Sequence, residues 1–140
     1  MRYWDTSALV PLVIAEAETE RMRSLVEEDP HVVTWAWTSV ELASAVERRA
    51  RQGELTREQR RSALARFAEL AEAWDEVTDV LMVRRRALAV LARHPLRAAD
   101  AAQLGAALAI APEQGRPLGF VGLDERLLDA AEREGLRPVP

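Results

Sequence analysis

The sequence predicts an α/β fold in which a central, mainly parallel sheet of four to five strands is covered by helices on both faces. Short strand-like runs alternate with longer amphipathic or alanine-rich runs throughout the chain. Acidic residues stand at several points where an apolar run gives way to a helix. The length of 140 residues suits a single domain spanning residues 1–140.

The first half of the chain is expected to form two strands and four helices. The strands are expected over residues 2–4 and 31–37, and the helices from residue 5, over about 16–28, over 38 to about 52, and from 56. β-branched and aromatic residues mark the strands, while Asp29-Pro30 and Gly53 end the second and third helices. The fourth helix opens with a capping box of Thr56 and Gln59. Its apolar side chains recur on one face at Leu64, Phe67, Leu70, Ala71 and Trp74.

The second half is expected to add three strands and three helices. The strands are expected over about 76–80, 118–123 and 136–139, and the helices over about 81–92, 100–111 and 124–134. His94-Pro95 ends the first of these helices, and a loop rich in Pro and Gly follows the alanine-rich second one. The last strand is expected at an edge of the sheet.

The composition excludes several classes of catalytic site. The chain has no cysteine, which rules out a disulfide framework and a thiolate metal site, and its two histidines lie far apart in sequence, which argues against zinc. It contains no Gly-x-Ser-x-Gly, Walker-type or Gly-x-Gly-x-x-Gly sequence. Any catalysis therefore has to use acidic side chains and a metal ion.

Charge and hydropathy predict a cytoplasmic protein without a membrane partner. No run approaches about 18 apolar residues, and Asp5 interrupts the apolar start where a signal peptide would continue. The net charge of −4 argues against nucleic-acid binding over the whole surface. Apart from histidine, every basic residue is arginine, which suits phosphate, so a local basic rim is possible. Each of the arginine runs at 48–51 and 84–86, taken alone, is better explained as a solvated helix face.

Four acids, Asp5, Glu41, Asp100 and Asp124, stand at the expected beginnings of helices. The carboxyl ends of parallel strands share one edge of the sheet, so these side chains are expected to gather there. Four such anions would repel one another unless a hard cation such as Mg²⁺ lay among them. Each acid alone is also explained as a helix cap, with Glu41 completing a Thr38-x-x-Glu41 capping box.

Four ordered motifs surround these acids. They are residues 3–9 (YWDTSAL), 39–45 (SVELASA, followed by Arg48), 96–104 (LRAADAAQL) and 120–127 (FVGLDERL). Together they resemble the motifs of PIN-domain nucleases, in particular the VapC-type toxins of type II toxin–antitoxin systems, over nearly the full chain. One departure is Gly122, at a position where family members often carry threonine.

The resemblance implies a PIN-like three-layer α/β/α sandwich that acts as a metal-dependent endoribonuclease. Asp5, Glu41, Asp100 and Asp124 would bind Mg²⁺, with Mn²⁺ as a substitute, and Thr6 or Ser7 would supply a hydroxyl near Asp5. Cleavage of RNA would leave a 5′-phosphate and a 3′-hydroxyl, with Arg48 and Arg97 holding the substrate. A homodimer and a VapB-like antitoxin, which could insert a cationic side chain among the acids, are the implied partners.

Within this expectation, Asp5 and Asp100 hold the principal ion and Glu41 binds it directly or through water. Asp124 completes a second metal site or orients the attacking water, and mechanisms with one ion or two both meet the chemical need. Two other classes of function remain open. The chain could be a PIN-fold binding or regulatory module without activity, or a phosphohydrolase with Asp5 as nucleophile, as in haloacid dehalogenase-type phosphatases. Those enzymes normally carry a second Asp two positions on, where this chain has Ser7.

Overall fold

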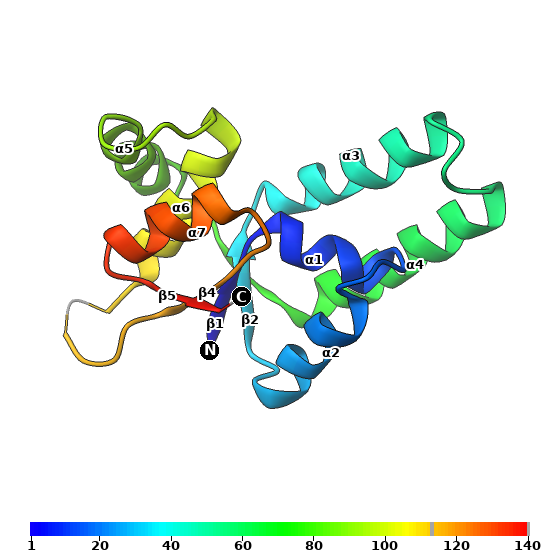
Figure 1. Cartoon of the computed structure of the whole chain (residues 1–140), viewed down its shortest axis with the longest axis horizontal. Coiled ribbons are helices and arrows are strands. Elements are labelled where there is room, and N and C mark those ends of the chain that lie inside the picture. Colours follow the sequence, from blue (N-terminus) through cyan, green and yellow to red (C-terminus); the bar gives the residue numbers. More distant parts are fainter. Residues whose placement is uncertain (113, 140) are drawn as a thin grey trace.

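The computed structural model describes residues 1–112 and 114–139 and has the predicted α/β architecture (Figure 1). The strands are β1 (Arg2–Trp4), β2 (Val32–Trp35), β3 (Asp75–Val77), β4 (Gly119–Val121) and β5 (Arg137–Val139). The helices are α1 (Thr6–Val13), α2 (Thr19–Glu28), α3 (Thr38–Arg51), α4 (Arg57–Ala73), α5 (Val80–Leu91), α6 (Ala98–Ile110) and α7 (Glu125–Arg133).

The five strands form one sheet in the order β3-β2-β1-β4-β5, and every neighbouring pair is parallel. From β1 the chain steps outward through β2 to β3, then returns to the other side of β1 for β4 and β5. The strand order therefore reverses between β1 and β4. In open parallel sheets, the crevice at the carboxyl ends of the strands beside such a reversal is where ligands bind.

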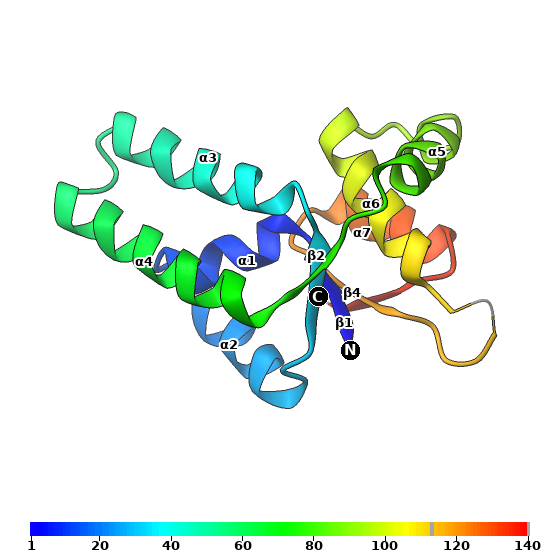
Figure 2. The same ribbon diagram turned by 180° about the vertical axis from the view of Figure 1, so that it is seen from behind.

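The sheet is covered on both faces, which confirms the predicted α/β/α layering. Helices α1 to α4 lie on one side and α5 to α7 on the other (Figures 1 and 2). Crossover connections between parallel strands are right-handed. When the strand order reverses, the later helices therefore lie on the opposite face of the sheet. Neighbouring side chains on β1 point to opposite faces, so Tyr3 joins the core under α5 to α7 and Trp4 joins the core under α1 to α4.

Some elements are shorter than the sequence predicts. Helix α2 begins at Thr19 because the Thr19 hydroxyl accepts a hydrogen bond from the Glu16 backbone N–H at 2.9 Å and holds the preceding residues in a turn. Strand β2 ends at Trp35, since Trp37 already has helical backbone angles and precedes α3. Strand β3 ends at Val77 because Asp79 caps α5.

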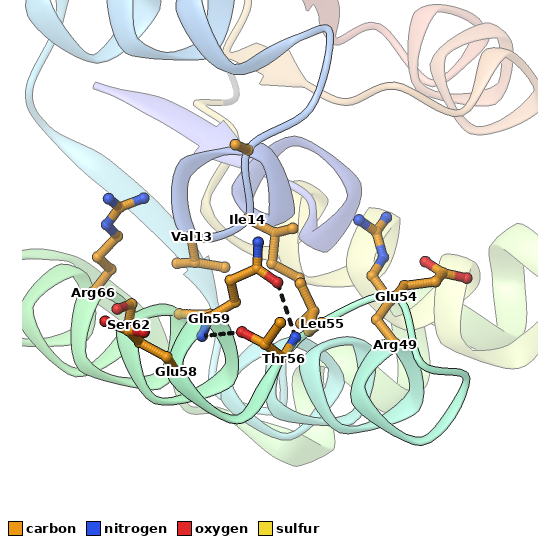
Figure 3. A pocket seen from close by; sticks show the side chains of 12 residues that line it. Val13, Ile14, Arg49, Glu54, Leu55, Thr56, Glu58, Gln59, Ser62 and Arg66 are labelled. Atoms are coloured by element: carbon orange, nitrogen blue, oxygen red, sulfur yellow. Dashed lines mark hydrogen bonds between the residues drawn. The ribbon is translucent and has the colours of Figure 1, made fainter.

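The predicted start of α4 is confirmed. The Thr56 hydroxyl accepts from the Gln59 backbone N–H at 3.1 Å, and the Gln59 side-chain oxygen accepts from the Thr56 N–H at 2.8 Å (Figure 3). At the other end of the helix, Trp74 is buried against Phe67, with ring centroids 6.0 Å apart. The apolar face of α4 therefore packs as its spacing predicts.

Helices α5 and α6 approach closely at Gly105. A Cβ atom there would lie 2.9 Å from both the backbone nitrogen of Ala87 and the backbone oxygen of Val83, which no larger residue could tolerate without moving the helices. Glycine therefore sets the packing of α6, the helix that carries Asp100. Within the described part of the chain, no helix combines the length and apolar character that a membrane crossing requires.

Candidate active site

Two of the four acids lie in the connections that follow the adjacent strands β1 and β4. Asp5 follows β1 and caps α1, while Asp124 lies three residues beyond β4 and caps α7. The Asp5 backbone N–H also donates to the Val121 carbonyl at 2.9 Å, which joins the ends of these two strands. These two acids therefore flank the point where the strand order reverses.

Asp5 is the most buried of the acids, with only 5% of its surface exposed. One carboxylate oxygen accepts from the Ser7 backbone N–H at 3.0 Å and from the Ser7 hydroxyl at 2.5 Å. The pKa of Asp5 is raised to about 6, mainly by burial and in part by the negative charges of Glu41 and Asp100, while the Ser7 hydrogen bonds act in the opposite direction. Three of the acids are therefore close enough to oppose ionisation at one site.

Asp100 reaches this edge by a different route, because it lies in the first turn of α6 and that helix follows α5 instead of a strand. Burial raises the pKa of Asp100, and the charge of Asp124 adds to this effect. The Arg97 backbone, by hydrogen bonding, and the Arg97 charge both act in the opposite direction. Electrostatic coupling thus links Asp100 to Asp124 as well as to Asp5.

Glu41 does not have the capping role that its spacing from Thr38 predicts. Helix α3 has no side-chain cap, so the predicted Thr38-x-x-Glu41 capping box is absent. Instead, one Glu41 oxygen accepts hydrogen bonds from the Thr6 hydroxyl and, at 2.8 Å, from the Gln103 amide. The predicted box is wrong because partners from distant segments, α1 and α6, bind the Glu41 side chain in its place.

Asp124 is exposed and does cap its helix. One of its oxygens accepts from the backbone N–H groups of Arg126 and Leu127, at 2.9 and 3.0 Å. Nearby, a Cβ atom built at Gly122 would lie 3.8 Å from the Cβ of Asp5. The hydroxyl that reaches Asp5 comes from Ser7, whose oxygen also accepts from the Leu123 N–H at 2.9 Å. Of the two predicted supporting hydroxyls, Ser7 thus contacts Asp5 and Thr6 contacts Glu41.

The acids share an edge of the sheet without converging on one point. Within residues 1–112 and 114–139, no three His, Cys, Asp or Glu side chains are close enough together to hold a metal ion. No arginine of the described chain forms an ion pair with any of the four acids. The chemistry of the donors, carboxylate oxygens with hydroxyl neighbours, suits Mg²⁺ or Mn²⁺, and Mg²⁺ needs only one or two protein carboxylates beside its waters.

The two predicted substrate arginines are associated with different acids, Arg48 with Asp124 and Arg97 with Asp100. Arg48 is exposed and lines a hollow of about 330 Å³ that Ser7 and Asp124 also line. Its neighbour Arg49 lines the same hollow but is paired with Glu16. Arg97, also exposed, precedes α6 and acts on Asp100. A phosphate in the hollow would therefore meet Arg48 beside Asp124.

A larger hollow, of about 660 Å³, lies between the end of α1 and the start of α4 (Figure 3). Apolar side chains, including Val13 and Leu55, and polar ones, including Arg49 and Arg66, line it. None of the four acids borders it. Of these two hollows, only the smaller one borders the candidate acids, and it does so through Asp124.

Gln103 is a site residue that the motif reasoning did not single out. It is 1% exposed, and its side-chain amide contacts Glu41 and Thr6. The one feature of the sequence that could have indicated Gln103 is a polar amide within the alanine-rich run of α6, three residues after Asp100.

Comparisons of the chain with protein-family models and with curated proteins find no match.

Proposed function

We propose that this protein is a divalent-metal-dependent endoribonuclease, the toxin of a VapBC-type pair. The observation that carries the proposal is the group of acids at the carboxyl edge of the sheet, where the pKa values of Asp5 and Asp100 are both raised. Carboxylates that are held together without a cationic partner destabilise the metal-free protein. Such an arrangement is expected where a bound cation compensates for the repulsion.

In this proposal, Asp5 and Asp100 hold the principal Mg²⁺ or Mn²⁺, and Glu41 reaches it directly or through water. Asp124 serves a second ion or orients water with the oxygen that is not committed to capping α7. When bound, the ion would neutralise phosphate oxygens and lower the pKa of water. Because no three described carboxylates converge on one point, the site fits a hydrated Mg²⁺ better than a closed cage.

The protein's own residues would orient the substrate and its surroundings. Ser7 fixes one oxygen of Asp5 and links it to the β4–α7 connection through the Leu123 N–H. Arg48, exposed beside Asp124, would bind a phosphate of the RNA backbone. In-line attack of water would leave a 5′-phosphate and a 3′-hydroxyl.

The proposal includes two protein partners, a second copy of the chain and a VapB-like antitoxin. Three exposed apolar side chains on α5 support the first, because Val80, Leu81 and Leu88 are 58, 65 and 63% exposed. Sedimentation equilibrium at micromolar concentration should give twice the mass of the chain. A cationic antitoxin side chain among the acids would block the site by occupying the place of the cation's charge.

Cleavage of structured RNA by the purified protein, with and without Mg²⁺ or Mn²⁺, tests the proposal. Asp100→Asn should lower the rate by about 10²-fold or more, as removal of an electrostatic catalytic group does. Asp129→Asn is the matched control, because Asp129 is 58% exposed and pairs only with its helix neighbour Arg133 among the described residues. The Asp129→Asn variant should cleave RNA at the same rate as the unchanged protein.

Three other results would redirect the proposal. Equal cleavage by Asp100→Asn and the unchanged protein would remove Asp100 from the site. No cleavage with any divalent ion and any RNA pool would favour a binding or regulatory module. Hydrolysis of small phosphomonoesters through a phosphorylated Asp5 would instead indicate an Asp-nucleophile phosphohydrolase.

A further inference from the structure

Gln103 is the buried centre of a polar network in an otherwise apolar part of α6. It is 1% exposed, and its α6 neighbours Leu104, Ala106 and Ala107 are fully buried. The network joins Gln103 to β1, α1 and α3 through the side chains of Tyr3, Thr6, Thr38 and Glu41. An apolar residue would fill this position without needing any of these partners.

The orientation of the Gln103 amide follows from its partners. The Tyr3 hydroxyl donates to the Gln103 oxygen at 2.6 Å, so the amide nitrogen must face the other way. That nitrogen lies 2.8 Å from Glu41 Oε2 and 2.9 Å from the hydroxyl oxygens of Thr6 and Thr38. Its two hydrogens therefore serve three acceptors.

The hydroxyl groups extend the network in a fixed direction. Thr6 accepts from Gln103 and donates its own hydrogen to Glu41 Oε2. Thr38 lies 2.8 Å from the Thr34 hydroxyl, which in turn donates to the Trp4 carbonyl at 2.8 Å. Both described donors to Glu41 thus bind the same oxygen, Oε2.

We propose that Gln103 is a positioning residue that holds Glu41 by Oε2 and so leaves Oε1 available to a divalent cation. The inference rests on the proposed metal-dependent function, and it gives a role in that function to a residue outside the four acids. A neutral amide is suited to this role, because an arginine or lysine at the same place would cancel the charge that attracts the cation. A carboxylate fixed in advance also loses less conformational entropy when the ion binds.

Titration of Mn²⁺ into the purified full-length protein by calorimetry tests the inference. Gln103→Met keeps an unbranched side chain of similar size but removes both amide donors. The Mn²⁺ dissociation constant should rise about 10- to 100-fold, as it does when a residue that orients a metal ligand is replaced. An unchanged dissociation constant, within about twofold, would overturn the inference.

The variant leaves the buried Tyr3 hydroxyl without its acceptor, so the double variant Tyr3→Phe/Gln103→Met is needed as well. Removing both partners makes the contact between positions 3 and 103 apolar, and the melting temperature of the double variant should lie close to that of the unchanged protein. If the inference holds, this stable double variant still binds Mn²⁺ about 10- to 100-fold more weakly. Recovery of full Mn²⁺ affinity together with stability would show that Gln103 only fills the core.

Thr34→Val is the matched control, because Thr34 belongs to the same buried network but does not touch Glu41. Its melting temperature should fall by about 5 °C while its Mn²⁺ affinity stays within about twofold. An equal loss of affinity in Thr34→Val would assign the effect to stability and overturn the inference. Failure of the unchanged protein to bind Mn²⁺ would refute the proposed function itself, whereas binding that Gln103 does not influence would refute only the inference.

Discussion

Two largely buried carboxylates of this protein lie in opposite electrostatic environments. Glu134, at the end of α7, has a side chain that is 14% exposed and accepts two hydrogen bonds of 2.7 Å from the Arg93 guanidinium and one of 2.7 Å from His94. The Arg93 hydrogen bonds lower the pKa of Glu134. Among the described residues, the Asp5 carboxylate accepts hydrogen bonds only from Ser7, and its burial raises its pKa to about 6.

The difference does not come from a shortage of cations. The chain has 19 arginines, and Arg60 also clamps Glu47 with two hydrogen bonds, at 2.9 and 2.5 Å. Glu134 and Glu47 are thus paired, while no described arginine forms an ion pair with any of the four acids at the carboxyl edge of the sheet. The cost to stability of such unpaired acids is expected where function requires the negative charge.

Among the substitutions that test this difference between Asp5 and Glu134, Asp5→Asn should have the largest effect on stability. The pKa of Asp5 rises from 3.8 to about 6 on folding, so between these values the folded state binds more protons than the unfolded state. The loss of folding stability caused by ionised Asp5 is therefore absent below about pH 4, grows between pH 4 and pH 6 and is complete above pH 6. A shift of this size corresponds to about 3 kcal/mol.

Asp5→Asn should therefore raise the free energy of unfolding by about 2 to 3 kcal/mol at pH 8 and hardly at all at pH 4. Urea unfolding in the presence of a chelator measures both values. The Asn oxygen can still accept the Ser7 hydrogen bonds, so the cap of α1 is retained. Equal stability of the two proteins at pH 8 would show that Asp5 is not under electrostatic stress.

For Glu134, the acid paired with Arg93, we expect removal of the charge to lower stability instead of raising it. Glu134→Gln removes the charge that binds Arg93 and His94, and should lower the free energy of unfolding by about 1 to 2 kcal/mol at pH 7. Because the folded pKa of Glu134 lies below its usual value, its contribution is present at neutral pH and is lost as the pH falls through the folded pKa. The loss of stability caused by Glu134→Gln should therefore become smaller as the pH falls toward 4. The gain of stability caused by Asp5→Asn should likewise disappear at pH 4.

Asp129→Asn provides the baseline for Glu134→Gln in the same urea experiment. Asp129 lies on the same helix and is 58% exposed beside Arg133. Its replacement should change the free energy of unfolding by less than about 0.5 kcal/mol. A Glu134→Gln effect no larger than this would mean that the Arg93 clamp contributes nothing beyond an ordinary surface pair.

Local spacing predicted the parts of the fold that local contacts determine. Thr56 and Gln59 cap α4 as their separation of three residues predicts, and Asp5 and Asp124 cap the helices that follow β1 and β4. The same rule failed for Thr38 and Glu41, although their spacing is identical. Nothing in residues 38–41 indicates that the Thr38 hydroxyl bonds to Thr34 and Gln103 and not to the start of α3.

The network around Glu41 is beyond the reach of pattern reasoning for the same reason. Gln103 lies 62 residues from Glu41 and 100 residues from Tyr3 in sequence, and only the packing of α6 against the sheet brings them into contact. The parallel sheet could be predicted because β-branched and aromatic runs recur between helices. The strand order, and with it the position of the reversal beside Asp5 and Asp124, depends on how the crossovers pack.

The smallest expected effect concerns Arg48, which lines the smaller hollow together with Asp124 and forms no ion pair with any described acid. If it binds an RNA phosphate, Arg48→Ala should raise KM about 2- to 5-fold, the range of an exposed ion pair worth under about 1 kcal/mol. Loss of one phosphate contact should also reduce the slope of log affinity against log salt by about 0.7. Arg21→Ala, at an exposed arginine on α2 paired with Glu18, is the charge-matched control and should leave both quantities unchanged. Equal effects of the two variants would mean that net charge, and not the position of Arg48 next to Asp124, governs the contact with RNA.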